Sequence, residues 1–321
     1  MNAEGMLVGN RVVVRSAGEI LSTLDTNGAL DGLPFMPEMV DWCGRSFRIQ
    51  RRVDKTCVEG HPMRRFPAND VVVLEGPRCD GSSHDGCKHG CRIYWKHAWL
   101  RPANEESAST DGDGVQSSDP AKEELRSRLK VKSDELRYFC QSTELLGSTE
   151  AFPPGRHRRI RVALTEIQNG DIGLFLALQL FGAFLRQRIL RLFGYDNLLR
   201  GPHDRTPKQS LNLQPGERVR VKSRAEIVKT LDHKMSNRGL GLCHEMMRYC
   251  GHETEVRYRV DRLINETTGL MRELTDSVTL SGVRGCGSLG EECLCPGEPG
   301  DCPRGELMYW REIWLERVSD R

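Results

Sequence analysis

The chain has 321 residues, enough for two or three domains that each bury a core. Its hydrophobic content of 38% and charged content of 29% are ordinary for a globular protein and exclude a wholly disordered chain. The formal net charge of only +2 gives no global argument for nucleic-acid binding, which would have to rest on local basic clusters.

Whether the cysteines are metal ligands or form disulfides depends on the cellular compartment of the protein. The N-terminal segment, residues 1–16, lacks a basic region followed by a continuous apolar stretch, which is the pattern of a signal peptide. We therefore expect a cytoplasmic protein. In that reducing compartment, the 12 cysteines indicate metal ligands before disulfides. Export by another route would make disulfides an equally good interpretation of the even number.

A segment near the N-terminus recurs near the C-terminus. Residues 9–54 match residues 216–261 at a constant offset. The matched ranges begin with GNRVVVRS in the first copy and GERVRVKS in the second. After a shift in register, YWKHAWL at 94–100 matches YWREIWL at 309–315. So many ordered matches, with tryptophans among them, establish an internal duplication.

Within the first copy the pattern predicts mostly short strands. A β-branched run at 11–15 is followed by a predicted helix at 17–24, with Ser16 as its N-cap and Glu19 at the third position. A helical turn is expected at 37–43, and further strands at 46–53 and 70–74. The tryptophans of the last strand are expected to anchor the core.

These elements predict an α+β fold with two homologous small β-barrel modules, of the SH3-like kind, joined by a helical middle segment. The predicted parts are a first module at 7–101, a flexible linker at 102–119, the helical middle at 120–205 and a second module at 211–318.

The middle segment begins with a clear helix signal. Asp119 is expected to cap a helix that has Pro120 at its first position and runs from 121 to about 148. The basic run at 156–161 could touch phosphate but is more typical of a solvated face. The stretch 172–193 has too few continuous apolar residues to span a bilayer, so we interpret it as a buried helix, with peripheral membrane contact as the alternative.

Two groups of cysteines occupy corresponding places in the modules. The predicted metal ligands are Cys57, Cys79, Cys87 and Cys91 with His84 in the first module, and Cys286, Cys293, Cys295 and Cys302 in the second. Structural zinc suits such thiolates, and a loop with few apolar residues needs such a ligand to fold. The spacing matches no known zinc signature, and an iron–sulfur cluster is the alternative cofactor. Cys43 and Cys250, at matched positions, are predicted to be small buried hydrophobic residues.

Three functions follow from these features. The first is a scaffold that binds a protein partner through Leu33, Phe35, Met36 and Glu38, since SH3-like barrels are mostly interaction modules. The second is an enzyme that uses a cysteine of the first cluster with His84 or His89 as a thiolate or open metal site. The third, nucleic-acid binding, is disfavoured by the net charge. The chain has no Walker, dinucleotide or G-x-S-x-G motif.

Three segments carry a resemblance to a known group of proteins. LDGLPFMPEM at 30–39, CDGSSH at 79–84 and YWREIWLERV at 309–318 resemble a family of bacterial proteins of unknown activity. The likeness extends over nearly the whole chain, including the Tyr-Phe-Cys-Gln residues of the middle segment. Its members often look like accessory members of biosynthetic gene sets. The resemblance implies a bacterial cytoplasmic protein but no reaction, so it assigns no catalytic residue.

Overall fold

The computed structural model describes residues 6–103 (except 54, 59, 60 and 62), 119–151, 200–284, 304–305 and 307–318, with six single positions between 164 and 189. It divides into two compact units: unit 1 is Met1–Ala177 with Ile264–Met271, and unit 2 is Leu178–Leu263 with Arg272–Arg321. Most of the linker, the basic run at 156–161 and most of the stretch 172–193 lie outside the described residues. Among the helices of the described parts, none combines the length and apolar character needed to cross a membrane.

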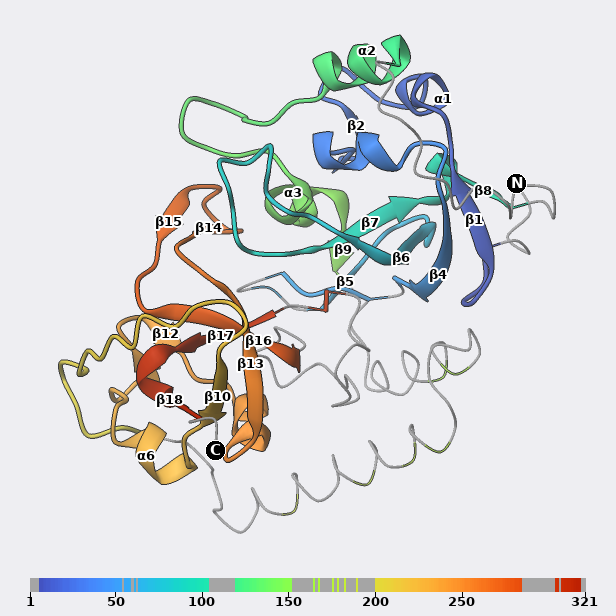
Figure 1. Ribbon diagram of the computed structural model, residues 1–321. Helices are drawn as coiled ribbons and strands as arrows, with labels where there is room; N and C mark the ends of the chain where they lie inside the picture. The colour runs from blue at the N-terminus through green and yellow to red at the C-terminus, as the bar shows by residue number, and fades with distance from the viewer. Residues whose placement is uncertain are drawn as a thin grey trace. The chain divides into compact units, whose positions relative to one another are not determined.

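The first module and the start of the middle segment belong to unit 1 (Figure 1). In chain order its elements are β1 (Arg11–Val14), α1 (Ala17–Leu21), β2 (Ala29–Leu30), β3 (Leu33–Pro34), the 3₁₀-helix η2 (Pro37–Trp42), β4 (Ser46–Arg52), β5 (Arg64–Arg65), β6 (Val71–Arg78), β7 (Arg92–Lys96), the 3₁₀-helix η3 (His97–Trp99), β8 (Leu100–Pro102), α2 (Pro120–Arg128), α3 (Gln141–Ser148) and β9 (Glu150–Ala151).

The elements of the second module are β10 (Arg218–Val221), α6 (Arg224–Val228), β11 (Ser236–Asn237), β12 (Leu240–Gly241), the 3₁₀-helix η5 (His244–Tyr249), β13 (Glu253–Arg259), β14 (Arg262–Ile264), β15 (Met271–Glu273), β16 (Ser277–Arg284), β17 (Leu307–Arg311), the 3₁₀-helix η6 (Glu312–Trp314) and β18 (Leu315–Arg317). The second module repeats the order of elements from β1 to β8, except that two strands, β14 and β15, stand where the first module has β5.

Each module contains a five-stranded antiparallel sheet, and the two sheets have the same strand order. The first is ordered β7-β6-β4-β1-β8 and the second β17-β16-β13-β10-β18. In each sheet the first strand of the module lies between two partners. β1 pairs with β8 and β4, and β10 pairs with β18 and β13. This shared topology confirms that the duplication in the sequence is a duplication of a β-rich fold.

The cores of the two modules are built on equivalent tryptophans. Trp95, Trp99, Trp310 and Trp314 are all 0% exposed, which confirms their predicted role as core anchors. The Trp99 indole Nε1 donates to the Thr23 hydroxyl (3.1 Å), and the Trp314 indole Nε1 donates to the Thr230 hydroxyl (2.9 Å). Trp99 and Trp314 therefore bury their apolar bodies and keep a partner for their N–H groups, whereas the Nε1 atoms of Trp95 and Trp310 are buried without one among the described residues.

The short helices begin as the sequence predicts. Ser16 and Glu19 form a capping box at the start of α1, and Ser223 and Glu226 form the same box at the start of α6. The predicted turn at 37–43 is the 3₁₀-helix η2, and Gly44 follows it with a φ of +83°. The helix α1 ends at Leu21, three residues earlier than the predicted limit.

The prediction of one continuous helix from 121 to about 148 was wrong. The helix α2 does begin at Pro120 with the Asp119 side chain accepting from the Ala121 N–H (3.0 Å), but it ends at Arg128. The Asp134 carboxylate accepts from the backbone N–H groups of Leu136 and Arg137, at 3.0 and 2.8 Å. Such side-chain acceptors favour a turn over a helix, so the chain reverses before α3 begins at Gln141.

The helix α3 lies beside β7 and is fixed to the first module through Gln141 (Figure 1). The Gln141 amide donates to the carbonyls of Tyr94 (2.8 Å) and Pro34 (3.0 Å), and its oxygen accepts from the Tyr94 N–H (2.8 Å). The side chain thus satisfies backbone groups of β7 and β3 that a further strand would otherwise pair. The preceding residue, Cys140, is positioned by the same contacts.

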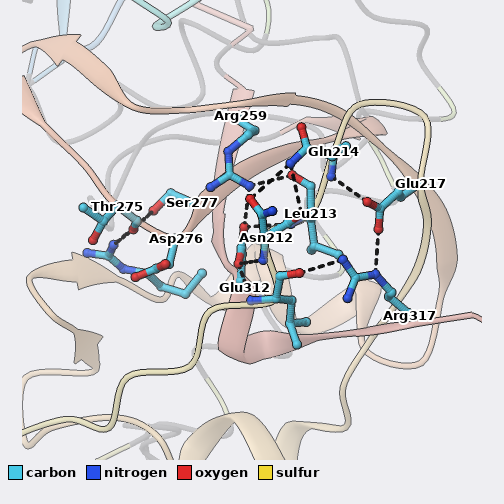
Figure 2. Close-up of polar contacts among 12 residues, drawn as sticks. Asn212, Leu213, Gln214, Glu217, Arg259, Thr275, Asp276, Ser277, Glu312 and Arg317 are labelled. Atoms are coloured by element: carbon cyan, nitrogen blue, oxygen red, sulfur yellow. Dashed lines mark hydrogen bonds and ion pairs between the residues drawn. The ribbon is translucent and has the colours of Figure 1, made fainter.

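In unit 2 the buried Glu312 carboxylate, 0% exposed, organises the segment before β10 (Figure 2). It accepts from the backbone N–H groups of Leu211 (2.5 Å), Asn212 (2.8 Å) and Leu213 (3.1 Å). The Arg259 guanidinium donates to the same carboxylate (2.9 Å) and to the Leu213 carbonyl (2.6 Å). A buried carboxylate with this many donors is fully compensated for its lost hydration.

Candidate metal centre

Glu38 is the centre of a buried polar cluster in unit 1. It lies in the first turn of η2, directly after Pro37, and its side chain is only 2% exposed. The carboxylate Oε1 accepts from the His84 Nδ1 (2.8 Å) and from the Ser83 backbone N–H (3.2 Å). Both partners belong to the loop between β6 and β7, so Glu38 joins η2 to that loop.

The loop between β6 and β7 is tightly folded, and this fold directs His84 inwards. Backbone N–H groups of His84 and Gly86 both donate to the Gly81 carbonyl, at 3.0 Å each. Gly81 has a φ of +73°, and a Cβ atom there would lie 2.1 Å from the Cys87 carbonyl oxygen. Only glycine fits this position, because a side chain would suffer both the backbone strain and the clash.

The Cys79 thiol completes the compact cluster. Its Sγ lies 3.9 Å from the Glu38 Oε1, to which the thiol donates. One ligand atom each from Glu38, Cys79 and His84 lies within 4.8 Å of the others. Burial, followed by the neighbouring Glu38 charge, raises the pKa of the Cys79 thiol well above its ordinary value. The thiol is therefore protonated unless a cation replaces its proton.

The second oxygen of Glu38 is the strongest indication of a ligand. Among the described residues, Glu38 Oε2 is buried and has no hydrogen-bond partner. A buried carboxylate oxygen without a partner is costly, and buried charges usually pair or bind metal. Oxygen, sulfur and imidazole nitrogen together suit Zn²⁺, which accepts all three kinds of ligand. The group contains one thiol, whereas an iron–sulfur cluster is held by cysteine thiolates in greater number.

The structure separates the other predicted ligands of the first module from this compact group. Cys87 is buried, and its Sγ accepts from the Ile264 backbone N–H (3.4 Å), a residue of the same unit. Cys91 lies across from Cys79, whose N–H donates to the Cys91 carbonyl (2.9 Å). Cys57 is half-buried next to the bridge between Thr56 and Arg64.

The predicted metal ligands of the second module have no described position in the structure. Cys286, Cys293, Cys295 and Cys302 all lie outside the described residues. Cys43 is buried in the core of the first module, as predicted, and Cys250 is half-buried against the core of the second.

The predicted partner-binding residues need a correction. Leu33, Phe35, Met36 and Glu38 are all buried, and the first three belong to the hydrophobic core of the first module. Phe35 packs edge-on against Trp99, with ring centroids 5.1 Å apart. Side chains enclosed in this way cannot contact a partner without unfolding the module. The Pro- and Met-rich composition of 33–39 reflects core packing and, at Glu38, the polar cluster.

The arrangement of His84 does not favour a cysteine–histidine catalytic pair. Its Nδ1 contacts Glu38, and its Nε2 faces the Phe139 carbonyl at 3.4 Å. A general base would hold its nitrogen against the thiol, and a reactive cysteine needs a lowered pKa. Here the pKa of the Cys79 thiol is raised. The cluster is better suited to hold a cation than to activate a nucleophile.

No family model, curated protein or solved structure matches the chain. The interpretation of the cluster therefore rests on the geometry of its own residues.

Proposed function

We propose that this protein is a metal-stabilised scaffold, in which zinc bound at Glu38, Cys79 and His84 holds the loop between β6 and β7 against the core of the first module. The unpartnered Glu38 Oε2, buried beside a thiol and an imidazole, is the observation that carries the proposal. A loop of glycines and polar residues cannot bury a core of its own, so the energy of metal binding would become folding energy.

We further propose that both modules are SH3-like barrels and that the scaffold binds a protein partner. The strand order supports this, together with the 3₁₀-helices η3 and η6 that join the last two strands of each module. By analogy at the level of the fold, the partner follows from the fact that SH3-like barrels are mostly interaction modules. The resemblance of the sequence adds the proposal of a cytoplasmic accessory protein in a bacterial biosynthetic pathway.

Metal analysis of the full chain tests the zinc site. Protein purified without chelators is analysed by mass spectrometry for zinc per chain, beside the variants Cys79→Ser and Glu38→Gln. Each variant should contain about one zinc fewer per chain than the wild type, because each removes a ligand. Since only the difference is used, any metal held elsewhere in the chain does not affect the result.

A matched control separates the site from general effects of losing a thiol. Cys250→Ser removes a half-buried cysteine outside the cluster and should leave the zinc content unchanged. Equal zinc contents in the wild type, Cys79→Ser and Glu38→Gln would show that the cluster holds no metal and would overturn the proposal.

A further inference from the structure

The outer face of the first sheet carries arginines on neighbouring strands. The strands β8, β1 and β4 lie side by side, and Val12 and Val14 of β1 belong to the hydrophobic core. Because side chains alternate along a strand, Arg11 and Val13 point to the opposite, outer face of the sheet. There Arg11 is half-buried, and Val13 is 3% exposed.

Strand pairing brings two further arginines to this outer face. Arg48 of β4 stands directly opposite Arg11, and Arg101 of β8 stands opposite Val13. Residues opposite one another in antiparallel strands have their side chains on the same face, and like charges in such pairs destabilise a sheet. We call Arg11, Arg48 and Arg101 the arginine face.

The arginine face has no carboxylate partner among the described residues. Arg48 and Arg101 are exposed, and none of the three guanidinium groups forms an ion pair within the described parts of the chain. Arg48 donates to the Gly9 carbonyl at 3.1 Å, and the Arg11 Nε is buried without a partner in the same parts. The repulsion between Arg11 and Arg48 is therefore not offset by a side chain of the described structure.

The second module holds carboxylates at the equivalent places. Five matched positions of the two sheets are occupied by Arg218, Arg220, Glu253, Glu255 and Glu316 in the second module and by Arg11, Val13, Ser46, Arg48 and Arg101 in the first. Arg218 pairs with Glu253 at 3.0 Å, and Arg220 pairs with Glu316 at 2.5 Å. Two arginines and three glutamates give this face of the second sheet a formal charge of −1, whereas three arginines give +3 in the first.

One carboxylate borders the arginine face. Continuing the pair Ile49–Leu74 by one residue places Glu75 of β6 opposite Arg48. The Glu75 side chain is exposed, and it forms no ion pair with Arg48 in the described parts of the chain. Three arginines and Glu75 leave a net charge of +2 on this side of the sheet.

We propose that the arginine face binds an acidic segment of the protein partner, whose carboxylates take the role that Glu253 and Glu316 have in the second module. The proposal rests on the partner binding of the proposed function and names its surface and its chemistry. A guanidinium group binds a carboxylate through two parallel N–H groups, and arginine clusters are a recurring means of recognising acidic motifs.

A protein segment suits this face better than a nucleic acid does. Proteins that bind a phosphate backbone make about 6–10 phosphate contacts, and those that bind single strands add aromatic side chains on which bases stack. The arginine face offers three cations beside Glu75, and none of its five positions is aromatic.

Binding of a labelled acidic peptide to the full chain tests the proposal. The probe is a fluorescein-labelled decamer of glutamate, and fluorescence anisotropy measures its affinity at about 50 mM salt, where exposed charges are weakly screened. The wild type should bind it, and Arg48→Glu/Arg101→Glu should lower the affinity by about tenfold or more, because two pairs are lost and two like charges are added. The double variant should fold, because Glu255 and Glu316 occupy the same places in the second sheet.

Two controls separate the face from a general effect of charge. Arg128→Glu/Arg205→Glu changes the net charge equally at two exposed arginines outside the face and should leave the affinity unchanged. Ser46→Glu adds the carboxylate that pairs with Arg218 in the second module, and it should lower the affinity by about threefold because it provides a partner for Arg11. Ser46→Gln, which adds no charge, should bind as the wild type does.

The outcomes distinguish this proposal from the zinc site. No binding to the wild type, or equal losses in the two double variants, would overturn the acidic-segment proposal. A decamer of thymidylate that binds more tightly than the peptide, and is lost in Arg48→Glu/Arg101→Glu, would assign the face to nucleic acid instead. Zinc per chain is measured in the same samples, so a failure of peptide binding while Cys79→Ser still loses zinc overturns this proposal alone.

Discussion

At the scale of single residues, Gly81 shows how the backbone makes the candidate site possible. We expect Gly81→Ala to lower the free energy of unfolding by more than about 2 kcal/mol, because the new Cβ would lie 2.1 Å from the Cys87 carbonyl oxygen. Gly76 is the matched control: it also has a positive φ, +95°, but apart from its chain neighbours no atom of the described residues lies within 4 Å of a Cβ built there. Gly76→Ala should cost only the backbone strain, about 1 kcal/mol.

Urea denaturation of the two variants measures the difference. Equal losses for Gly81→Ala and Gly76→Ala would mean that the loop moves away from the added methyl group and that the close approach is not essential.

The half-buried His97 is expected to make the stability of the first module depend on pH. Burial lowers the pKa of His97 below its ordinary value and outweighs the Asp70 charge, which raises it, while the positive charges of Arg52 and Lys96 lower it further. The folded state therefore favours the neutral ring, and its stabilising contribution is present above the unfolded pKa of about 6.5. That contribution is lost as the pH falls through the folded-state pKa, because the unfolded chain binds the proton first.

We expect the free energy of unfolding to fall between pH 7 and pH 5, and His97→Gln to reduce this slope. The exposed His61 is the control, and His61→Gln should leave the slope as it is in the wild type. Denaturation curves at several pH values measure both. An unchanged slope for His97→Gln would assign the pH dependence to other groups.

At the scale of secondary-structure elements, Gln141 is a buried polar link between the start of α3 and the first module, beside the bonds of Arg64 to the end of the helix. Gln141→Ala would leave the Tyr94 N–H and the carbonyls of Tyr94 and Pro34 without this partner. An unsatisfied buried polar group costs about 1–3 kcal/mol, so we expect a loss of several kcal/mol in the free energy of unfolding. The neighbouring Ser142 hydroxyl is buried without a partner among the described residues, and Ser142→Ala should be neutral or stabilising.

The elements themselves were predicted where local signals agree with the fold. The capping boxes at Ser16 and Ser223 and the β-branched strands are such signals, and the structure contains them. The continuous helix from 121 to about 148 failed because Asp134 binds backbone N–H groups and forms a turn. Tyr138, Phe139 and Cys140 are also of types that are weak helix formers, and Cys140 is extended, with a φ of −149°, directly before α3.

At the scale of the whole molecule, the duplication was predictable and the candidate site was only partly so. Large, rare residues repeat in order, and they repeat because equivalent tryptophans fill equivalent cores. The site combines Glu38 with Cys79 and His84, and the packing of η2 against the β6–β7 loop brings these distant residues together. Cysteine spacing identified Cys79 and His84, but no local pattern distinguishes a buried metal-binding Glu38 from the core residues around it.

Glu312 and Glu38 should stabilise different units of the molecule. Glu312→Ala removes the acceptor of three backbone N–H groups and of Arg259, which leaves buried donors unsatisfied. We expect the free energy of unfolding of unit 2 to fall by about 3 kcal/mol or more. Hydrogen exchange followed by mass spectrometry should show faster exchange in β10, β13 and β18, with unchanged zinc content.

Glu38→Gln is the reciprocal test, because it changes the buried carboxylate of the other unit. It should lower the zinc content and increase hydrogen exchange in η2, in the β6–β7 hairpin and in the first turn of α3, while β10, β13 and β18 keep their protection. Together, the variants Glu312→Ala and Glu38→Gln distinguish two roles of a buried carboxylate. Glu312 is already satisfied by protein donors, whereas Glu38 keeps one oxygen without a partner among the described residues. If Glu38→Gln instead left exchange in the first module unchanged, that oxygen would have no part in holding the loop.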